Sequence, residues 1–341
     1  MTSFLVVSFF SGCAARPAED PLNLSLEQVK RQIRVGPAAL TAGTARVEIT
    51  PPVGVPLAGY AKRRGRSSIG IRDPLFVRAL AMSDGQDTLV LISADLLVFP
   101  HPLAEELAGE ISARLAIPRQ AVILTTTHTH SGAGAYAHGF LHEQVFGPLD
   151  SKVLEGIRAR VLWAAQQAAQ KQEPVRWAGS VEEKGLDGFL ENRADPAGPT
   201  DPALGVLLLE TAEGRVKAVV VSAAAHPTLL DSNVMRLSAD FPGEVCRRIE
   251  SDYAGSTCLF VNGAAGDVRP WGGIGENPEE QVSRFGALLA EAVEGQVSRT
   301  APSGEGDLAA WGRLTHLPEP QIRLGPIPLP EGGDLEDIPI G

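Results

Sequence analysis

Residues 121–132 read AVILTTTHTHSG and decide the fold: an apolar run passes directly into two histidines and a glycine. A short apolar run of this kind predicts a buried strand. Apolar side chains four positions apart predict a helix over 101–115, because such positions share one helical face. A strand-like run at 88–94 precedes that helix, so the chain here runs strand, helix, strand.

Two predicted hairpins modify this α/β pattern. Strand-like runs at 76–82 and 88–94 flank Ser83-Asp84-Gly85, and runs at 204–210 and 215–224 flank residues 211–214. Because hairpins add antiparallel pairs, we expect an α/β fold with a mixed sheet flanked by helices rather than a purely parallel sheet. The remaining predicted elements are strands at 44–50, 175–180 and 257–261 and helices at 151–172, from 241 onward and at 278–298.

The composition is that of a globular protein of enzyme size. The chain has 341 residues, of which 44% are hydrophobic and 21% are charged, close to the average for folded domains. Its net charge of -11 argues against a nucleic-acid partner, because phosphate binding needs a concentrated basic surface. One basic run is interpreted as a solvated loop and consists of Lys62, Arg63, Arg64 and Arg66.

The N-terminal segment has the pattern of an export signal. The apolar run at residues 4–10 is too short to span a bilayer and is typical of a signal peptide, although no Lys or Arg precedes it. It leads into Phe10-Ser11-Gly12-Cys13, which resembles a bacterial lipobox. We therefore expect a periplasmic or cell-envelope lipoprotein attached to the membrane through Cys13, or otherwise a secreted protein. A frayed cytosolic N-terminus is the alternative.

Composition also divides the chain into parts. We expect a leader at 1–20, a tether at 21–42, a catalytic-type domain at 43–300 and a Pro/Gly-rich, incomplete C-terminal part at 301–341. In an exported protein Cys246 and Cys258 could form a disulfide. Because two cysteines make no disulfide framework, two buried small side chains are the favoured interpretation.

Three of the histidines follow predicted strands. His128 and His130 are one residue apart after the strand, so on an extended backbone both side chains face the same side. His226 follows the strand at 215–224 in the same way. Strand ends are where α/β proteins build sites, and neutral imidazole is the commonest zinc ligand. The pattern favours a metal site shared by the two strand ends; the alternative is a hydrogen-bonded pair that holds the loop.

A glycine-rich turn after the strand at 257–261 contains two further candidates. Its small residues, at 263–266, would let the backbone come close to a ligand. Asp267 is a candidate ligand or orienting carboxylate, and Arg269 is a candidate anion clamp. The alternative is a salt bridge inside the turn.

These motifs, in this order and approximate spacing, resemble the catalytic domain of the neutral/alkaline, non-lysosomal ceramidase family over roughly residues 43–300. The residues that carry the resemblance are Ala58-Gly59-Tyr60 with Gly70-Ile71, Ser93-Ala94-Asp95, Thr127-His128-Thr129-His130-Ser131-Gly132, Asn192-Arg193, His226-Pro227-Thr228, Ser238-Ala239-Asp240-Phe241-Pro242-Gly243 and Gly266-Asp267-Val268-Arg269-Pro270. The resemblance implies a ceramidase-like fold and a zinc ion (Zn2+) held by His128 and His226. It also implies a glutamate and a tyrosine ligand further downstream, which we expect beyond the end of this chain.

One position departs from the family pattern. The family's nucleophilic serine lies in Gly-Asp-Val-Ser-Pro, where this chain has Arg269. Arginine stays protonated in proteins, so it cannot act as a metal-activated nucleophile. We therefore expect a zinc-dependent hydrolase in which metal-bound water directly attacks an amide, such as that of an N-acyl sphingosine-like lipid or another small molecule, or a related ester.

The expected roles follow from this hypothesis. His130 is the candidate general base or loop anchor, and Arg269 the clamp for an anion or a developing oxyanion. Asp267, with Asp95 and Asp240, is a candidate for a third ligand or for orienting the imidazoles. Because the serine is missing, the alternative function is a catalytically inactive, ceramidase-like binding or scaffold protein of the cell envelope.

Overall fold

The computed structural model describes residues 40–302, and their strands form one eight-stranded mixed sheet with the order β11-β9-β8-β6-β1-β3-β4-β5. Pairs β4–β5 and β9–β11 are parallel, and the other neighbours are antiparallel. The strands are β1 (Thr41–Glu48), β3 (Phe76–Ser83), β4 (Thr88–Ala94), β5 (Val122–Thr126), β6 (Glu173–Glu182), β8 (Leu204–Thr211), β9 (Val216–Ala223) and β11 (Thr257–Asn262).

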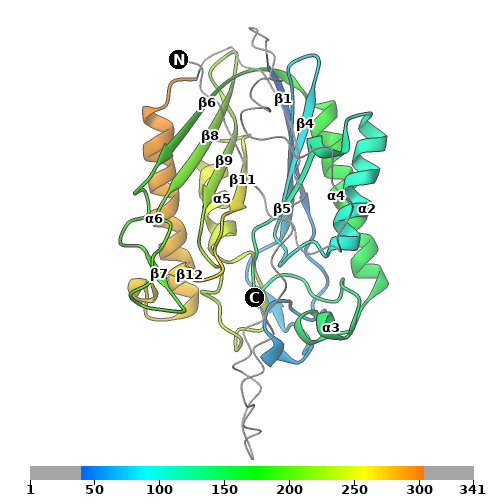
Figure 1. Ribbon diagram of the computed structural model, residues 1–341, viewed down its shortest axis with the longest axis vertical. Helices are drawn as coiled ribbons and strands as arrows, with labels where there is room; N and C mark the ends of the chain where they lie inside the picture. Colours follow the sequence, from blue (N-terminus) through cyan, green and yellow to red (C-terminus); the bar gives the residue numbers. More distant parts are fainter. Residues whose placement is uncertain (1–39, 303–341) are drawn as a thin grey trace, which may run out of the picture.

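The sheet consists of two halves that pack against each other. Only a short pairing of β1 with β6, at Thr41 and Ala42, joins the halves. Strand β11 of one half contacts β3, β4 and β5 of the other, and Figure 1 shows the two halves side by side. Apolar side chains from both halves, such as Leu80, Leu91, Leu207 and Leu259, fill the space between them. This central core brings the ends of β5 and β9 to the same region of the molecule.

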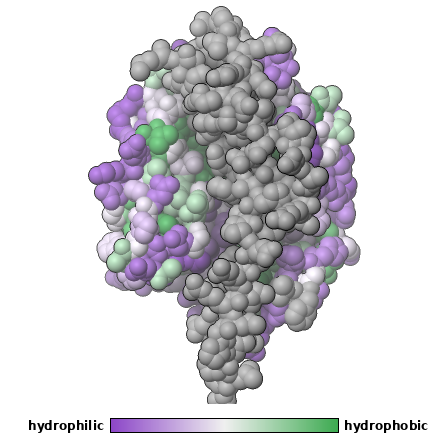
Figure 2. All heavy atoms as spheres, in the orientation of Figure 1, coloured by the Kyte–Doolittle hydropathy of each residue, from purple (hydrophilic) through white to green (hydrophobic). Residues whose placement is uncertain are grey.

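Helices cover the outer face of each half. Helices α2 (His101–Leu115) and α4 (Ser151–Gln170) pack on the first half, and α5 (Asp240–Asp252) and α6 (Pro278–Arg299) on the second. The result is four layers in the order helix, sheet, sheet, helix (Figure 1). Because both faces of most central strands are buried, these strands are almost continuously apolar. Hydrophilic residues predominate along the outer flanks of the molecule (Figure 2).

The α/β fold with a mixed sheet and flanking helices is confirmed. The helix at 101–115 and the strand at 88–94 have the predicted bounds, and both predicted hairpins form, as β3–β4 and β8–β9. Helix α4 begins where Asp150 accepts a hydrogen bond from the amide of Lys152, and α6 begins at the corresponding cap, Asn277. The small elements were not predicted: α3 (Phe140–Phe146), β2 (Gly70–Ile71), β7 (Leu190–Asn192), β10 (Arg236–Leu237), β12 (Val268–Pro270), η1 (Ala61–Arg63), η2 (Arg119–Ala121) and η3 (Gly272–Ile274).

Several sequence predictions lie outside the described residues. These are the leader with Cys13, nearly all of the tether, and the chain from residue 303 onward. Within 40–302, no helix is both long and apolar enough to cross a membrane. Cys246 and Cys258 are buried free thiols that pack in the core of the second half, as the favoured interpretation expected.

Candidate metal centre

Three histidines converge where strands β5 and β9 end. One ring nitrogen from each of His128, His130 and His226 lies within 4.8 Å of the other two. The centroid of the His226 ring is 4.7 Å from each of the other two rings. His128 has a left-handed backbone conformation (φ 65°), which turns the chain sharply after β5. The two strand-end sites predicted from sequence therefore form a single cluster.

The orientations of two imidazoles are fixed by main-chain carbonyl groups. The Nδ1 atom of His128 is 2.8 Å from the carbonyl oxygen of Leu97, and Nδ1 of His226 is 2.9 Å from that of Ala265. A carbonyl oxygen only accepts, so each Nδ1 must carry the proton and donate it. Each Nε2 is then left with a free lone pair, which is the arrangement found in metal-binding histidines.

His130 completes the cluster in a different way. Its Nε2 lies 2.8 Å from Nε2 of His226, so one proton between the two nitrogens makes a hydrogen bond. Its Nδ1 is buried and has no hydrogen-bond partner among the described residues. A buried polar atom without a partner calls for an explanation, and a cluster of three imidazoles that could hold a cation offers one. The three residues fit a metal ion.

Electrostatics keep the imidazoles neutral. Burial lowers the pKa of His128, lowers that of His130 well below its usual range, and lowers that of His226 to about 4. The charge of Arg193 lowers all three further. Metal ions bind the neutral form of histidine, so these lowered pKa values keep the cluster in its ligand form at neutral pH.

The turn that holds Asp267 and Arg269 is anchored next to His226. The amide of His226 donates a 2.8 Å hydrogen bond to the carbonyl oxygen of Val268, in β12. The Asp267 carboxylate accepts from the side-chain amide of Asn192 at 3.1 Å, while Arg269 is half-exposed and pairs with Glu191 at 2.7 Å. Both side chains thus have partners on β7 rather than each other.

Arg193 and Tyr60 belong to the site, although no individual role was predicted for either of them. The Arg193 amide and guanidinium donate to the carbonyl oxygens of Asp267 and Gly266, and its charge acts on all three histidines. The Tyr60 ring lies 4.9 Å from the His130 ring. Both residues stand in the family motifs quoted above, and that was the one signal that could have found them.

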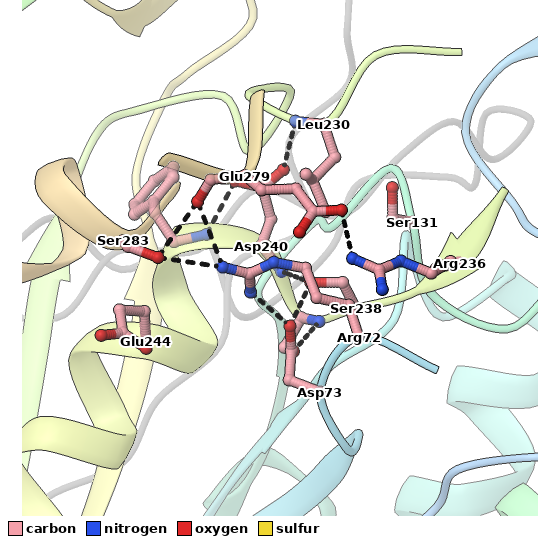
Figure 3. Close-up of polar contacts among 12 residues, drawn as sticks. Arg72, Asp73, Ser131, Leu230, Arg236, Ser238, Asp240, Glu244, Glu279 and Ser283 are labelled. Atoms are coloured by element: carbon pink, nitrogen blue, oxygen red, sulfur yellow. Dashed lines mark hydrogen bonds and ion pairs between the residues drawn. The ribbon is translucent and has the colours of Figure 1, made fainter. Parts of the chain in front are cut away.

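The other two candidate carboxylates lie in other networks. Asp95 is buried and forms a 2.9 Å ion pair with Arg78. Asp240, at the start of α5, accepts from the amide of Leu230 (Figure 3) and from that of Phe241. Burial raises its pKa to about 6. Within residues 40–302, neither joins the histidine cluster, where main-chain carbonyls orient the imidazoles instead.

The interpretation of the basic run as a solvated loop is wrong for one residue. Lys62, Arg64 and Arg66 are exposed, whereas Arg63 is fully buried. A short 3-10 turn, η1, rotates this side chain inward, and no periodicity in the sequence announces such a turn.

Comparison with known proteins places the fold in a family. The description "Neutral/alkaline non-lysosomal ceramidase, N-terminal" matches residues 40–303. The chain belongs to this ceramidase family. Among solved structures, the neutral ceramidase from Pseudomonas aeruginosa is 21% identical with a TM-score of 0.68, and the match covers 77% of this chain and 46% of that one.

A second solved structure, a ceramidase complexed with C2, is similar to the same extent. It is 20% identical with a TM-score of 0.69, and the match covers 77% of this chain and 45% of that one. The chain of this family member therefore spans about half the length of the two ceramidase structures. The likeness confirms the fold and the family resemblance seen in the sequence.

Proposed function

We propose that this protein is a zinc-dependent hydrolase that cleaves the amide bond of an N-acyl, sphingosine-like lipid, or a related small-molecule amide or ester. Membership of the ceramidase family supports a hydrolase. The observation that carries the proposal is the convergence of three neutral imidazoles, two of which direct an Nε2 lone pair away from a carbonyl-bound Nδ1.

His128 and His226 are the residues that would hold the ion, with His130 beside them. A purely nitrogen donor set of this kind suits zinc. When bound, zinc supplies Lewis-acid polarisation of a carbonyl and lowers the pKa of bound water to about 7. The side chains around the ion would bind the substrate, orient it and neutralise the negative charge that develops on it.

Water is the nucleophile in this proposal because Arg269 stands where the family has serine. Arg269 would clamp an anionic group or the oxyanion that develops during attack, and Arg193 adds a second positive charge facing the cluster. Asp267 would act by holding Asn192 and, through its carbonyl, Arg193.

His130 has two proposed roles. Its unpartnered Nδ1 could accept a proton from water, as a general base does. Its strongly lowered pKa makes it a weak base at neutral pH, however, so the role of a loop anchor or third ligand is favoured.

The proposal extends to the cellular location. The signal-like run at 4–10 and the lipobox-like Cys13 support an exported lipoprotein of the cell envelope, or otherwise a secreted protein. Mass spectrometry of the mature N-terminus tests this: a diacylated Cys13 supports it, and an unprocessed Met1 contradicts it.

A catalytically inactive binding or scaffold protein is the second candidate. The observation that favours it is the ion pair between Arg269 and Glu191. Arg269 stands at the position of the family's nucleophile, and an arginine cannot attack a carbonyl. Such a protein would keep the fold and the metal ion but would not hydrolyse a substrate.

One experiment separates the two candidates. The full-length protein is assayed on N-acyl sphingosine, other N-acyl amides and esters, with and without a zinc chelator. Chelator-sensitive turnover by the wild type supports the hydrolase. No turnover by the wild type but turnover by Arg269→Ser supports an inactive relative with an intact site, and Arg269→Lys is the control that keeps the charge.

A further inference from the structure

Arg63 is a fully buried arginine within a run of exposed basic residues. It ends the short helix η1, and its side chain is fully buried. A buried guanidinium is costly unless its donors are satisfied, so its partners show what it does there.

Its two terminal nitrogens connect three separate segments. Nη1 donates to the carbonyl oxygens of Ala58, at 3.0 Å, and His130. Nη2 donates to the Ser131 hydroxyl at 3.3 Å and to the carbonyl oxygens of Asp231 at 3.1 Å and Val234 at 3.0 Å. The segment that carries His130 and the loop that follows His226 are thus held by one side chain.

Tyr60 links the same guanidinium to the imidazole ring of His130. The Arg63 Cζ atom lies 4.7 Å from the centroid of the Tyr60 ring, and that ring lies 4.9 Å from the His130 ring. The Tyr60 hydroxyl donates to the carbonyl oxygen of Leu230 at 3.1 Å, in the loop that Nη2 also holds. Guanidinium, phenol and imidazole therefore lie in a row, with the Tyr60 and His130 rings tilted at 58° to each other.

Arg78 shows how different this arrangement is from an ordinary buried ion pair. Arg78 is also buried, but it pairs with the carboxylates of Asp95 at 2.9 Å and Glu250 at 3.1 Å. The hydrogen-bond partners of the Arg63 terminal nitrogens are four carbonyl oxygens and a hydroxyl. A lysine ammonium has three N–H donors on one nitrogen, fewer than the five acceptors around Arg63, whereas the planar fork of arginine spreads its donors over two terminal nitrogens.

We infer that Arg63 is a positioning residue for the metal centre: it fixes His130 relative to His226 by clamping the segments that carry them. Hydrogen-bond partners outside the ligand shell orient the ligands and tune metal affinity by 10- to 100-fold in known sites. The zinc-affinity measurement for this inference rests on the proposed metal site, whereas the NMR measurement on the metal-free protein does not.

The test compares Arg63→Lys and Arg63→Met with Arg78→Lys and Arg78→Met in the full chain. Zinc affinity is measured by competition with a chromophoric chelator, and unfolding by thermal melting of the metal-free proteins. Arg63→Lys should bind zinc at least about tenfold more weakly than the wild type, and Arg63→Met more weakly still. Arg78→Lys and Arg78→Met should lower the melting temperature while zinc affinity stays within about threefold of the wild type.

A second measurement needs no metal. In the metal-free wild type, side-chain 15N NMR should show one set of imidazole signals for His130 in a single tautomer. In Arg63→Lys these signals should split or broaden, and in Arg78→Lys they should not. If Arg63→Lys melts earlier but keeps wild-type zinc affinity and a single set of His130 signals, Arg63 is merely structural and the inference is overturned.

The two failures can be told apart. A wild type that binds no zinc contradicts the proposed metal site, and the NMR comparison then decides the role of Arg63 by itself. If Arg63→Met does not fold, Arg63→Lys carries both measurements.

Discussion

The Nε2 atoms of His130 and His226 lie 2.8 Å apart, although 96 positions separate the two residues in the chain. Nδ1 of His226 already donates to Ala265, so its Nε2 carries a lone pair. At this separation a proton on Nε2 of His130 makes the contact a hydrogen bond. This contact joins the two halves of the sheet at the candidate metal centre.

Gly59 leaves room for His130. Its φ is 109°, and a Cβ placed there would lie 2.6 Å from Cα of His130. Gly59→Ala should therefore displace His130, weaken zinc binding at least about tenfold and destabilise the protein by more than the ~1–3 kcal/mol of the backbone strain alone. Chelator competition and urea unfolding measure the two effects.

Gly54 offers a matched control. Its φ of 107° imposes the same strain on an alanine, but a Cβ there meets no atom within 4 Å among the described residues. Gly54→Ala should lose stability without losing zinc affinity. Equal zinc affinity in the two variants would show that the closeness of Gly59 to His130 has no bearing on the site.

The stability of the metal-free protein should depend on the protonation of His226. Its pKa falls from 6.5 to about 4 on folding because of burial, so between these pH values the unfolded chain binds more protons than the folded one. The contribution of neutral His226 to the free energy of unfolding is complete above about pH 6.5 and is lost as the pH falls towards 4. The lost stability is about 3 kcal/mol, at roughly 1.4 kcal/mol per pKa unit.

The comparison with His226→Asn isolates this effect. Buried Asp240 acts in the opposite direction, because its pKa is raised to about 6 and its contribution declines as the pH rises from 3.8 to 6. Asp240 is present in both proteins, so it cancels in the difference. The difference in unfolding free energy, wild type minus variant, should rise between pH 4 and 6.5; a flat difference would show that His226 is not buried in its neutral form.

Asp95 should matter for stability and not for the metal. It is 1% exposed and pairs with Arg78, which is 3% exposed, so Asp95→Asn leaves a buried charge short of one partner. A loss of about 3–5 kcal/mol is expected, with unchanged zinc stoichiometry. Loss of zinc at unchanged stability would instead place Asp95 at the metal.

Much of the fold could be predicted because its long elements have strong periodicity. The helix at 101–115 and the strand at 88–94 each contain enough apolar positions to define their type and bounds. Strands β7 and β12 have three residues each, too few to show a pattern, and exist because they pair with each other beside His226. The packing of the two sheet halves is a tertiary effect that local patterns do not contain.

The site was predictable in part for the same reason. His128, His130 and His226 could be predicted as site residues because each follows an apolar strand, and local sequence determines where such strands end. The burial of Arg63 was not predictable, since a lone arginine in a basic run normally points to solvent. Its inward turn depends on carbonyl groups more than a hundred residues away, at Asp231 and Val234.

The most direct test of the central claim is the zinc content of the full-length protein and of His128→Ala, with His142→Ala, an exposed histidine outside the cluster, as the control. We predict about one zinc ion per chain in the wild type and in His142→Ala, and nearly complete loss in His128→Ala. A stoichiometry well below one in the wild type, with no further loss in His128→Ala, would contradict a metal centre at these histidines.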